Sequence, residues 1–256
     1  YALQQDRQTL FIEKMSDVYY KRIEMAPNNL KLYISFAKAL KDAKRYEDAI
    51  AVYELATANN PSYWKGYYRV AEVYRENLNN SQKAIEYYEK ALTIDPGNAD
   101  VLYELALYSY KELNDYGKAK KYFEQILNSD AKDDDKVNAY KGLGNMYSEQ
   151  KDNARAVEMY EKALALDYDA TVGVIVAQKY LDMRNFDKAE QTILKVLQNP
   201  GRQEAMANYI AGDVYKQKGD LAKAKTYFQK ATSHPDVGRS AREQIEAIDK
   251  QLGGGQ

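Results

Sequence analysis

Side chains that commonly perform catalysis are sparse in this chain of 256 residues. There is no cysteine, which excludes disulfides, thiolate metal sites and cysteine nucleophiles. The single histidine, His234, precedes Pro235 at a predicted junction between helices, where we interpret it as an ordinary loop residue. An enzyme needs an acid, a base or a nucleophile in a defined site. We therefore predict a protein without catalytic activity.

Two further patterns could bind ions, but neither has the required spacing. Asp133, Asp134 and Asp135 are consecutive, whereas the calcium loop of an EF-hand spaces its oxygen ligands and needs a central glycine. We interpret this run as a solvated acidic connector. The glycines form no phosphate-binding pattern, and residues 253–256 are expected to be a flexible tail. The sequence predicts no metal site and no cofactor.

The overall charge argues against a role in binding nucleic acids. Lysine and arginine together number 37 and aspartate and glutamate 38, which gives a net charge of −1. No apolar run approaches the roughly 20 residues that span a bilayer. The chain begins at Tyr1 rather than methionine, so we expect its native N-terminus to be missing, with any signal or anchor that it carries. The composition suits a cytoplasmic and an extracytoplasmic protein equally.

The five prolines lie at regular intervals. They are separated by 34, 35, 104 and 35 residues, and 104 is close to three times 35. Proline disrupts the interior of a helix, and each of these follows an amphipathic helical pattern. They are Pro27, Pro61, Pro96, Pro200 and Pro235. A period of 34 to 35 residues indicates an array of helical repeats.

Small and large apolar residues repeat with the same period. Alanine recurs at positions 49, 84, 119, 156, 189 and 224, and a large side chain follows four residues later at Tyr53, Tyr88, Phe123, Tyr160, Ile193 and Phe228. Positions i and i+4 share a helix face, so the alanine permits close packing and the large side chain fills the space beside it. An upstream helix carries its own small residue at Ala37, Ala71, Ala106, Gly144 and Gly212. Each repeat is therefore predicted to be an antiparallel helix pair that buries its apolar stripe by stacking on its neighbours.

This spacing resembles that of the tetratricopeptide repeat (TPR) family. The resemblance implies an all-α, right-handed superhelical solenoid of antiparallel helix pairs. We expect six full repeats, at residues 30–63, 64–98, 99–136, 137–169, 170–204 and 205–235. Residues 1–29 are predicted to be a truncated repeat or a leading helix pair, and residues 236–252 a capping helix. The fifth repeat diverges, with Gly173 in place of the usual ring, and we expect any softer joint to lie within residues 130–173.

Members of the TPR family bind peptides or protein segments in a concave groove lined by the first helix of each repeat, the A helix. Matching the family's groove positions to this sequence selects Lys38, Lys65, Tyr68, Arg69, Glu72, Tyr103, Leu107, Tyr110, Lys141, Asn145, Gln178 and Tyr209. The basic residues of the first two repeats predict acidic character in the ligand, although such lysines also serve solubility alone. The tyrosines and Leu107 predict apolar or aromatic anchors.

One specific function within the family is disfavoured by these positions. Some members hold the C-terminal carboxylate of chaperones with lysine, arginine and asparagine side chains drawn from three repeats. Lys141 and Asn145 match the first pair of that set. Gln178, Tyr209 and Asp213 occupy the remaining places, and the charge of Asp213 would repel a carboxylate.

The sequence therefore predicts a protein-binding scaffold that holds a partner segment in its groove and supports the assembly of a multiprotein complex. Two alternatives remain open at this point. One is a structural repeat protein that self-associates. The other is the repeat domain of a larger protein that is anchored to a membrane or takes part in secretion or assembly.

Overall fold

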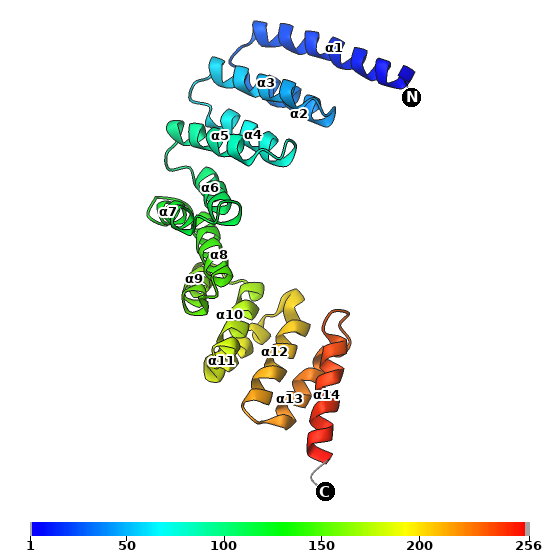
Figure 1. The fold of residues 1–256 in the computed structure, drawn as a ribbon, viewed down its shortest axis with the longest axis vertical. Coiled ribbons are helices and arrows are strands. Elements are labelled where there is room, and N and C mark those ends of the chain that lie inside the picture. Colours follow the sequence, from blue (N-terminus) through cyan, green and yellow to red (C-terminus); the bar gives the residue numbers. More distant parts are fainter. Residues whose placement is uncertain (1, 254–256) are drawn as a thin grey trace. The chain divides into compact units, whose positions relative to one another are not determined.

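The computed structural model describes residues 2–253, and within them every regular element is a helix (Figure 1). The helices are α1 (Ala2–Met25), α2 (Leu30–Asp42), α3 (Tyr46–Asn59), α4 (Trp64–Glu76), α5 (Ser81–Ile94), α6 (Ala99–Lys111), α7 (Tyr116–Leu127), α8 (Asp133–Glu149), α9 (Asn153–Leu166), α10 (Ala170–Asp182), α11 (Phe186–Gln198), the 3₁₀ helix η1 (Gly201–Gln203), α12 (Glu204–Gln217), α13 (Leu221–Ala231) and α14 (Gly238–Gly253). The predicted all-α repeat architecture is confirmed.

The chain forms two compact units, the first ending at Ala131 and the second beginning at Lys132. In the first unit, α1 packs on α2, and the pairs α2–α3, α4–α5 and α6–α7 follow. The second unit contains the pairs α8–α9, α10–α11 and α12–α13, and α14 packs against α13 where a capping helix was expected. The division falls inside the segment 130–173, and the softer joint expected there stays a prediction.

The turn within each helix pair has the same construction throughout. One residue adopts a left-handed backbone, with φ between 48° and 60° at Lys44, Asn79, Asn114, Lys151 and Arg184, and φ of 82° at Gly219. In five of these turns the next residue caps the following helix, because its side chain accepts a hydrogen bond from a backbone N–H in the first turn of that helix. The capping residues are Asn80, Asp115, Asp152, Asn185 and Asp220. The turn thus ends one helix and starts the next within a few residues.

The predicted pairing of small and large residues forms the core of each repeat. Tyr88 and Phe228 are fully buried. A Cβ atom added to Gly212 would lie 2.6 Å from the ring of Phe228, and one added to Gly144 would lie 2.5 Å from the ring of Tyr160. These contacts are shorter than any ordinary van der Waals contact. The two A helices therefore approach their partners more closely than an alanine would allow.

One predicted boundary between repeats is wrong, and of the two alternatives for residues 1–29 only the truncated repeat stays a prediction. Asp133, Asp134 and Asp135 are not a connector but the first turn of α8, where carboxylates interact favourably with the positive end of the helix dipole. The predicted boundary between residues 136 and 137 consequently lies inside this helix. Residues 2–25 form one continuous helix rather than a leading pair. Gly253 ends α14, and the rest of the predicted tail, residues 254–256, lies outside the described residues.

Candidate binding faces

In the first unit, the candidate residues lie on the A helices α2, α4 and α6. We call Lys38, Lys65, Tyr68, Arg69, Glu72, Tyr103 and Leu107 the first A-helix face. Helix α4 buries Gly66, Val70, Ala71 and Val73 against its neighbours, which leaves Lys65 and Arg69 exposed and Tyr68 and Glu72 half-buried. The face is therefore the part of each A helix that the repeat core does not use.

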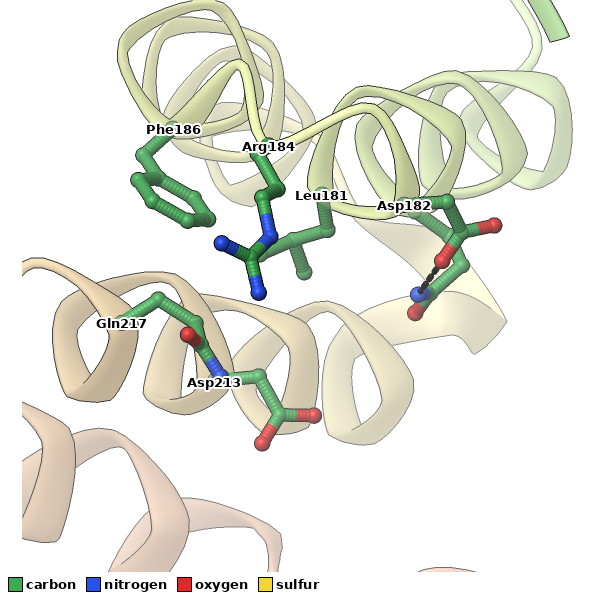
Figure 2. Close-up of a pocket in the computed structure, with 7 residues that line it drawn as sticks. Leu181, Asp182, Arg184, Phe186, Asp213 and Gln217 are labelled. Carbon is green, nitrogen blue, oxygen red and sulfur yellow. Dashed lines mark hydrogen bonds between the residues drawn. The ribbon is translucent and has the colours of Figure 1, made fainter.

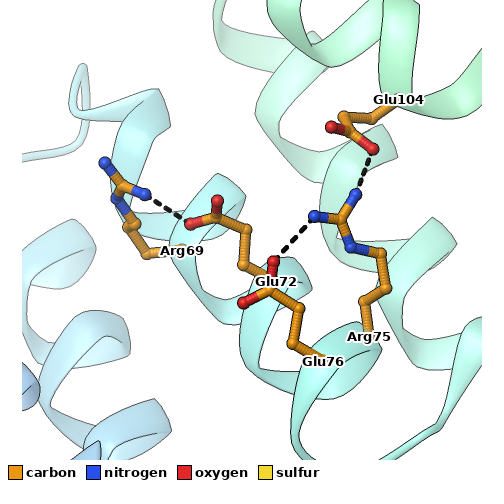
Figure 3. A network of polar contacts seen from close by, with 5 residues as sticks. All are labelled: Arg69, Glu72, Arg75, Glu76 and Glu104. Carbon is orange, nitrogen blue, oxygen red and sulfur yellow. Dashed lines mark hydrogen bonds and ion pairs between the residues drawn. The ribbon is translucent and has the colours of Figure 1, made fainter. Parts of the chain in front are cut away.

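Arg69 of the first A-helix face, and Arg75 further along α4, are neutralised by nearby carboxylates (Figure 3). Arg69 Nη1 donates to Glu72 Oε2 at 2.6 Å. Arg75 donates to Glu76 Oε1 at 2.8 Å and also to Glu104, which α6 contributes from the next repeat. Burial raises the pKa of Glu104 even though the charge of Arg75 opposes this effect. Exposed ion pairs contribute little stability, but these pairs cancel the positive charge that the arginines were expected to offer.

Lysines keep their charge available on the same face. Lys38 and Lys65 are exposed, and no ion pair involves either of them among the side chains of residues 10–253. Lys65 Nζ lies 5.3 Å from the ring centroid of Trp64, within the range of a cation–π interaction. The basic character of the face therefore rests on its lysines.

The tyrosines of the face have a partly structural role. Tyr68 packs edge-on against Tyr88, with 5.4 Å between ring centroids, and burial together with the charges of nearby carboxylates raises its pKa to about 12. Tyr103 packs in the same way against Phe123 at 5.8 Å. Each ring is half-buried, so one part stabilises its repeat and the other part remains at the surface.

Tyr110 was expected at the surface, and this prediction is wrong. Its side chain is only 1% exposed. It lies on α6 in a run of three buried residues, and burying a ring removes a large apolar area from water. Leu107 is half-buried and lines a cavity of about 180 Å³ with Glu104 and Tyr108. Tyr110 is thus part of the repeat core, whereas Leu107 reaches the surface.

In the second unit, two candidate residues have internal partners. Lys141 Nζ donates to Asp169 Oδ2 at 2.8 Å, and Asn145 Oδ1 accepts a hydrogen bond of 2.6 Å from the hydroxyl of Tyr160. Burial opposes the ionisation of Asp169, but hydrogen bonds from Lys141 and from the backbone N–H of Thr171 outweigh it and lower the pKa of Asp169. Asp169 therefore neutralises the lysine of the pair that resembles a carboxylate clamp, and Tyr160 fixes the orientation of its asparagine.

A cavity of about 330 Å³ is lined in part by Gln178, another candidate of the second unit (Figure 2). It is lined by Gln178, Leu181, Asp182, Arg184, Phe186, Asp213 and Gln217, which come from α10, α11, α12 and the turn between α10 and α11. Gln178 is exposed at its rim and donates from Nε2 to Asp182 Oδ1 at 2.9 Å. Tyr209 is half-buried on α12 and packs edge-on against Phe228 at 5.4 Å.

Sequence reasoning did not select several residues that shape these sites. Glu104, Arg184 and Gln217 were not among the candidates, because they lie outside the family's usual groove positions. The distance of 29 residues between Arg75 and Glu104 gave no local signal for their ion pair. Arg184 occupies the repeating left-handed turn position, which its residue type does not reveal.

Geometry and sequence lead to the same class of protein, an array of antiparallel helix pairs. Four family profiles described as tetratricopeptide repeat match residues 34–99, 79–142, 139–171 and 205–233. The chain belongs to the tetratricopeptide repeat family. The matched ranges leave out residues 172–204, where the sequence predicted a divergent repeat.

Solved structures share this fold at low sequence identity. The C-terminal part of a TPR repeat-containing protein from Cytophaga hutchinsonii is 17% identical, with a TM-score of 0.70 and coverage of 94% of this chain and 96% of that one. PilF of Pseudomonas aeruginosa is 21% identical, with a TM-score of 0.60 and coverage of 86% and 96%. PilW, a type IV pilus biogenesis factor, is 18% identical, with a TM-score of 0.58 and coverage of 86% and 99%. These likenesses show the fold alone. No curated protein matches the chain.

Between residues 2 and 253, no helix has both the length and the apolarity needed to cross a membrane. Across the same residues, no three histidine or acidic side chains are grouped in a way that could hold a metal ion.

Proposed function

We propose that this chain is a non-catalytic scaffold that binds a segment of a partner protein on its A-helix faces and supports the assembly of a multiprotein complex. The observation that carries the proposal is the contrast between the two sides of each A helix. The packed side repeats the same small and large residues, whereas the first A-helix face, apart from the equivalent Tyr68 and Tyr103, carries side chains that differ from repeat to repeat. Membership of the TPR family and its protein-interaction role support this reading.

The partner segment is proposed to combine acidic residues with an apolar or aromatic anchor. Lys38 and Lys65 offer exposed, unpaired charge, and the surface portions of Tyr68 and Tyr103 offer ring area at low entropic cost. The neutralised arginines instead provide hydrogen-bonding groups of fixed orientation. Electrostatic attraction to the lysines would mainly speed association and select against basic partners.

Selection of short random peptides on the immobilised chain tests this proposal. We expect the selected peptides to be enriched in aspartate or glutamate next to an aromatic or aliphatic residue. A double variant, Lys38→Glu with Lys65→Glu, should weaken their binding by at least roughly tenfold. Both lysines are exposed and lack ion pairs, so the variant should fold as the parent does.

A matched control is available on a B helix, the second helix of a repeat. Lys121 on α7 is also exposed, and Lys121→Glu should leave peptide binding unchanged. Equal binding by the parent and the double variant would contradict the proposed face. Failure to select any saturable binder would contradict the scaffold function itself.

A further inference from the structure

The cavity between α10 and α12 contains an unpartnered carboxylate. Asp213 is half-buried, and no hydrogen bond or ion pair involves its side chain among residues 2–253. The nearest opposing charge is Lys216, but Lys216 Nζ donates to Gln244 Oε1 of α14 at 2.7 Å. Burying a charge without a partner costs free energy, and burial raises the pKa of Asp213 to about 6. The fold thus maintains an unfavourable charge at the surface of this cavity.

The other side chains of the cavity determine what could neutralise that charge. The charged groups of the cavity are two carboxylates, Asp182 and Asp213, and one guanidinium, that of Arg184. Asp182 accepts a hydrogen bond from Gln178. Arg184 and Asp213 both line the cavity but form no ion pair, and Figure 2 shows the Asp213 carboxylate turned away from the Arg184 guanidinium. Leu181 and Phe186 provide apolar surface beside them. The cavity therefore favours a cation that carries an apolar stem.

The size and the lining of the cavity argue against three other occupants, which are a large ligand, a metal ion and an anion. A volume of about 330 Å³ lies at the lower end of the range for small-ligand pockets, about 300–1,000 Å³, which suits one side chain better than a large ligand. A metal ion needs several converging oxygen or nitrogen ligands, and no such group exists among residues 2–253. An anion would be attracted by Arg184 but repelled by both carboxylates.

We propose that this cavity, named here the Asp213 cavity, receives a lysine or arginine side chain of the partner segment. The charged end of that side chain meets Asp213, and its methylene groups lie against Leu181 and Phe186. The inference rests on the proposed function and adds a basic anchor to the partner's chemistry. A carboxylate clamp in this unit would need a basic side chain where Asp213 stands. Asp213 instead attracts a positively charged group.

Nuclear magnetic resonance titration of the full chain tests the cavity directly. The probes are N-acetyl-arginine amide and N-acetyl-citrulline amide, which have similar shape and differ in charge. The arginine probe should produce saturable shifts at the amides of Leu181 and Phe186, and the citrulline probe should not. Asp213→Asn should weaken binding of the arginine probe by roughly tenfold or more, since a charge-assisted hydrogen bond is lost.

Asp236→Asn is the matched control, because Asp236 is 83% exposed, lies outside the cavity and carries the same charge. It should leave the titration unchanged. Equal binding of both probes, full binding by Asp213→Asn, or the lack of any saturable shift would overturn the inference. Those results would leave the peptide-selection experiment intact, because it relies on Lys38 and Lys65 rather than Asp213. Conversely, a failed selection with a successful titration would overturn the scaffold function but not the cavity.

Discussion

Replacing Asp213 with asparagine should stabilise the second unit at neutral pH. The pKa of this carboxyl is raised from an ordinary value of 3.8 to about 6, because the fold buries it and only Lys216 opposes the effect. A difference of that size corresponds to about 3 kcal/mol between the two protonation states. Partial exposure to solvent reduces the expected gain to about 1–2 kcal/mol.

The gain should depend on pH in a defined direction. A carboxyl group whose pKa is raised by folding contributes stability that is fully present below its unfolded value of 3.8 and is lost as the pH rises through about 6. Asparagine has no such titration. The stability difference between Asp213→Asn and the parent should therefore be largest above about pH 7 and several-fold smaller near pH 4.

Urea denaturation followed by circular dichroism measures this difference at the two pH values, since urea is uncharged and does not screen the carboxylate. Because repeat arrays need not unfold in one step, hydrogen exchange of the α12 amides should accompany it. A variant that is less stable than the parent at neutral pH would refute the reasoning. So would a gain of the same size at both pH values, since that result would not depend on ionisation.

Four further substitutions test the packing and capping that hold the faces in place. Gly212→Ala should destabilise the chain by about 1–3 kcal/mol because its new Cβ meets the ring of Phe228. Gly117→Ala on α7 would place its Cβ in ordinary contact, 3.6 Å from Asp115 Oδ1, and should stabilise the chain by up to about 1 kcal/mol in the same denaturation assay. Tyr88→Phe removes a buried hydroxyl that has no partner among the described residues, so thermal unfolding should show equal or greater stability, and a loss above about 1 kcal/mol would contradict this. Asn185→Ala removes the cap of α11 and should cost about 1 kcal/mol, seen as faster hydrogen exchange in the first turn of that helix.

The periodic part of the structure could be predicted from the sequence. The spacing of the prolines and alanines predicted the helix pairs, and the large side chains expected to lock them, including Tyr88 and Phe123, are buried. Local rules explain why this succeeded, because residues four apart on a helix share a face in every repeat. The residues with a left-handed backbone, such as Lys44 and Arg184, recur with the same period. Their residue types do not indicate that conformation.

The details of the faces could not be predicted in the same way. Tyr110 occupies a groove position of the family, yet its burial depends on packing that the spacing does not encode. The ion pair between Arg69 and Glu72 follows from a local spacing of three residues, but the one between Arg75 and Glu104 joins successive repeats. Charges assigned one residue at a time therefore overestimated the basic character of the first A-helix face.

Mapping a selected peptide onto the isotopically labelled full chain tests the central claim most directly. The account predicts that chemical-shift changes at saturation concentrate on the A helices, including the amides of Lys38 in α2 and of Lys65 and Tyr68 in α4. Changes that concentrate instead on the B helices, such as around Lys121 in α7, would contradict it.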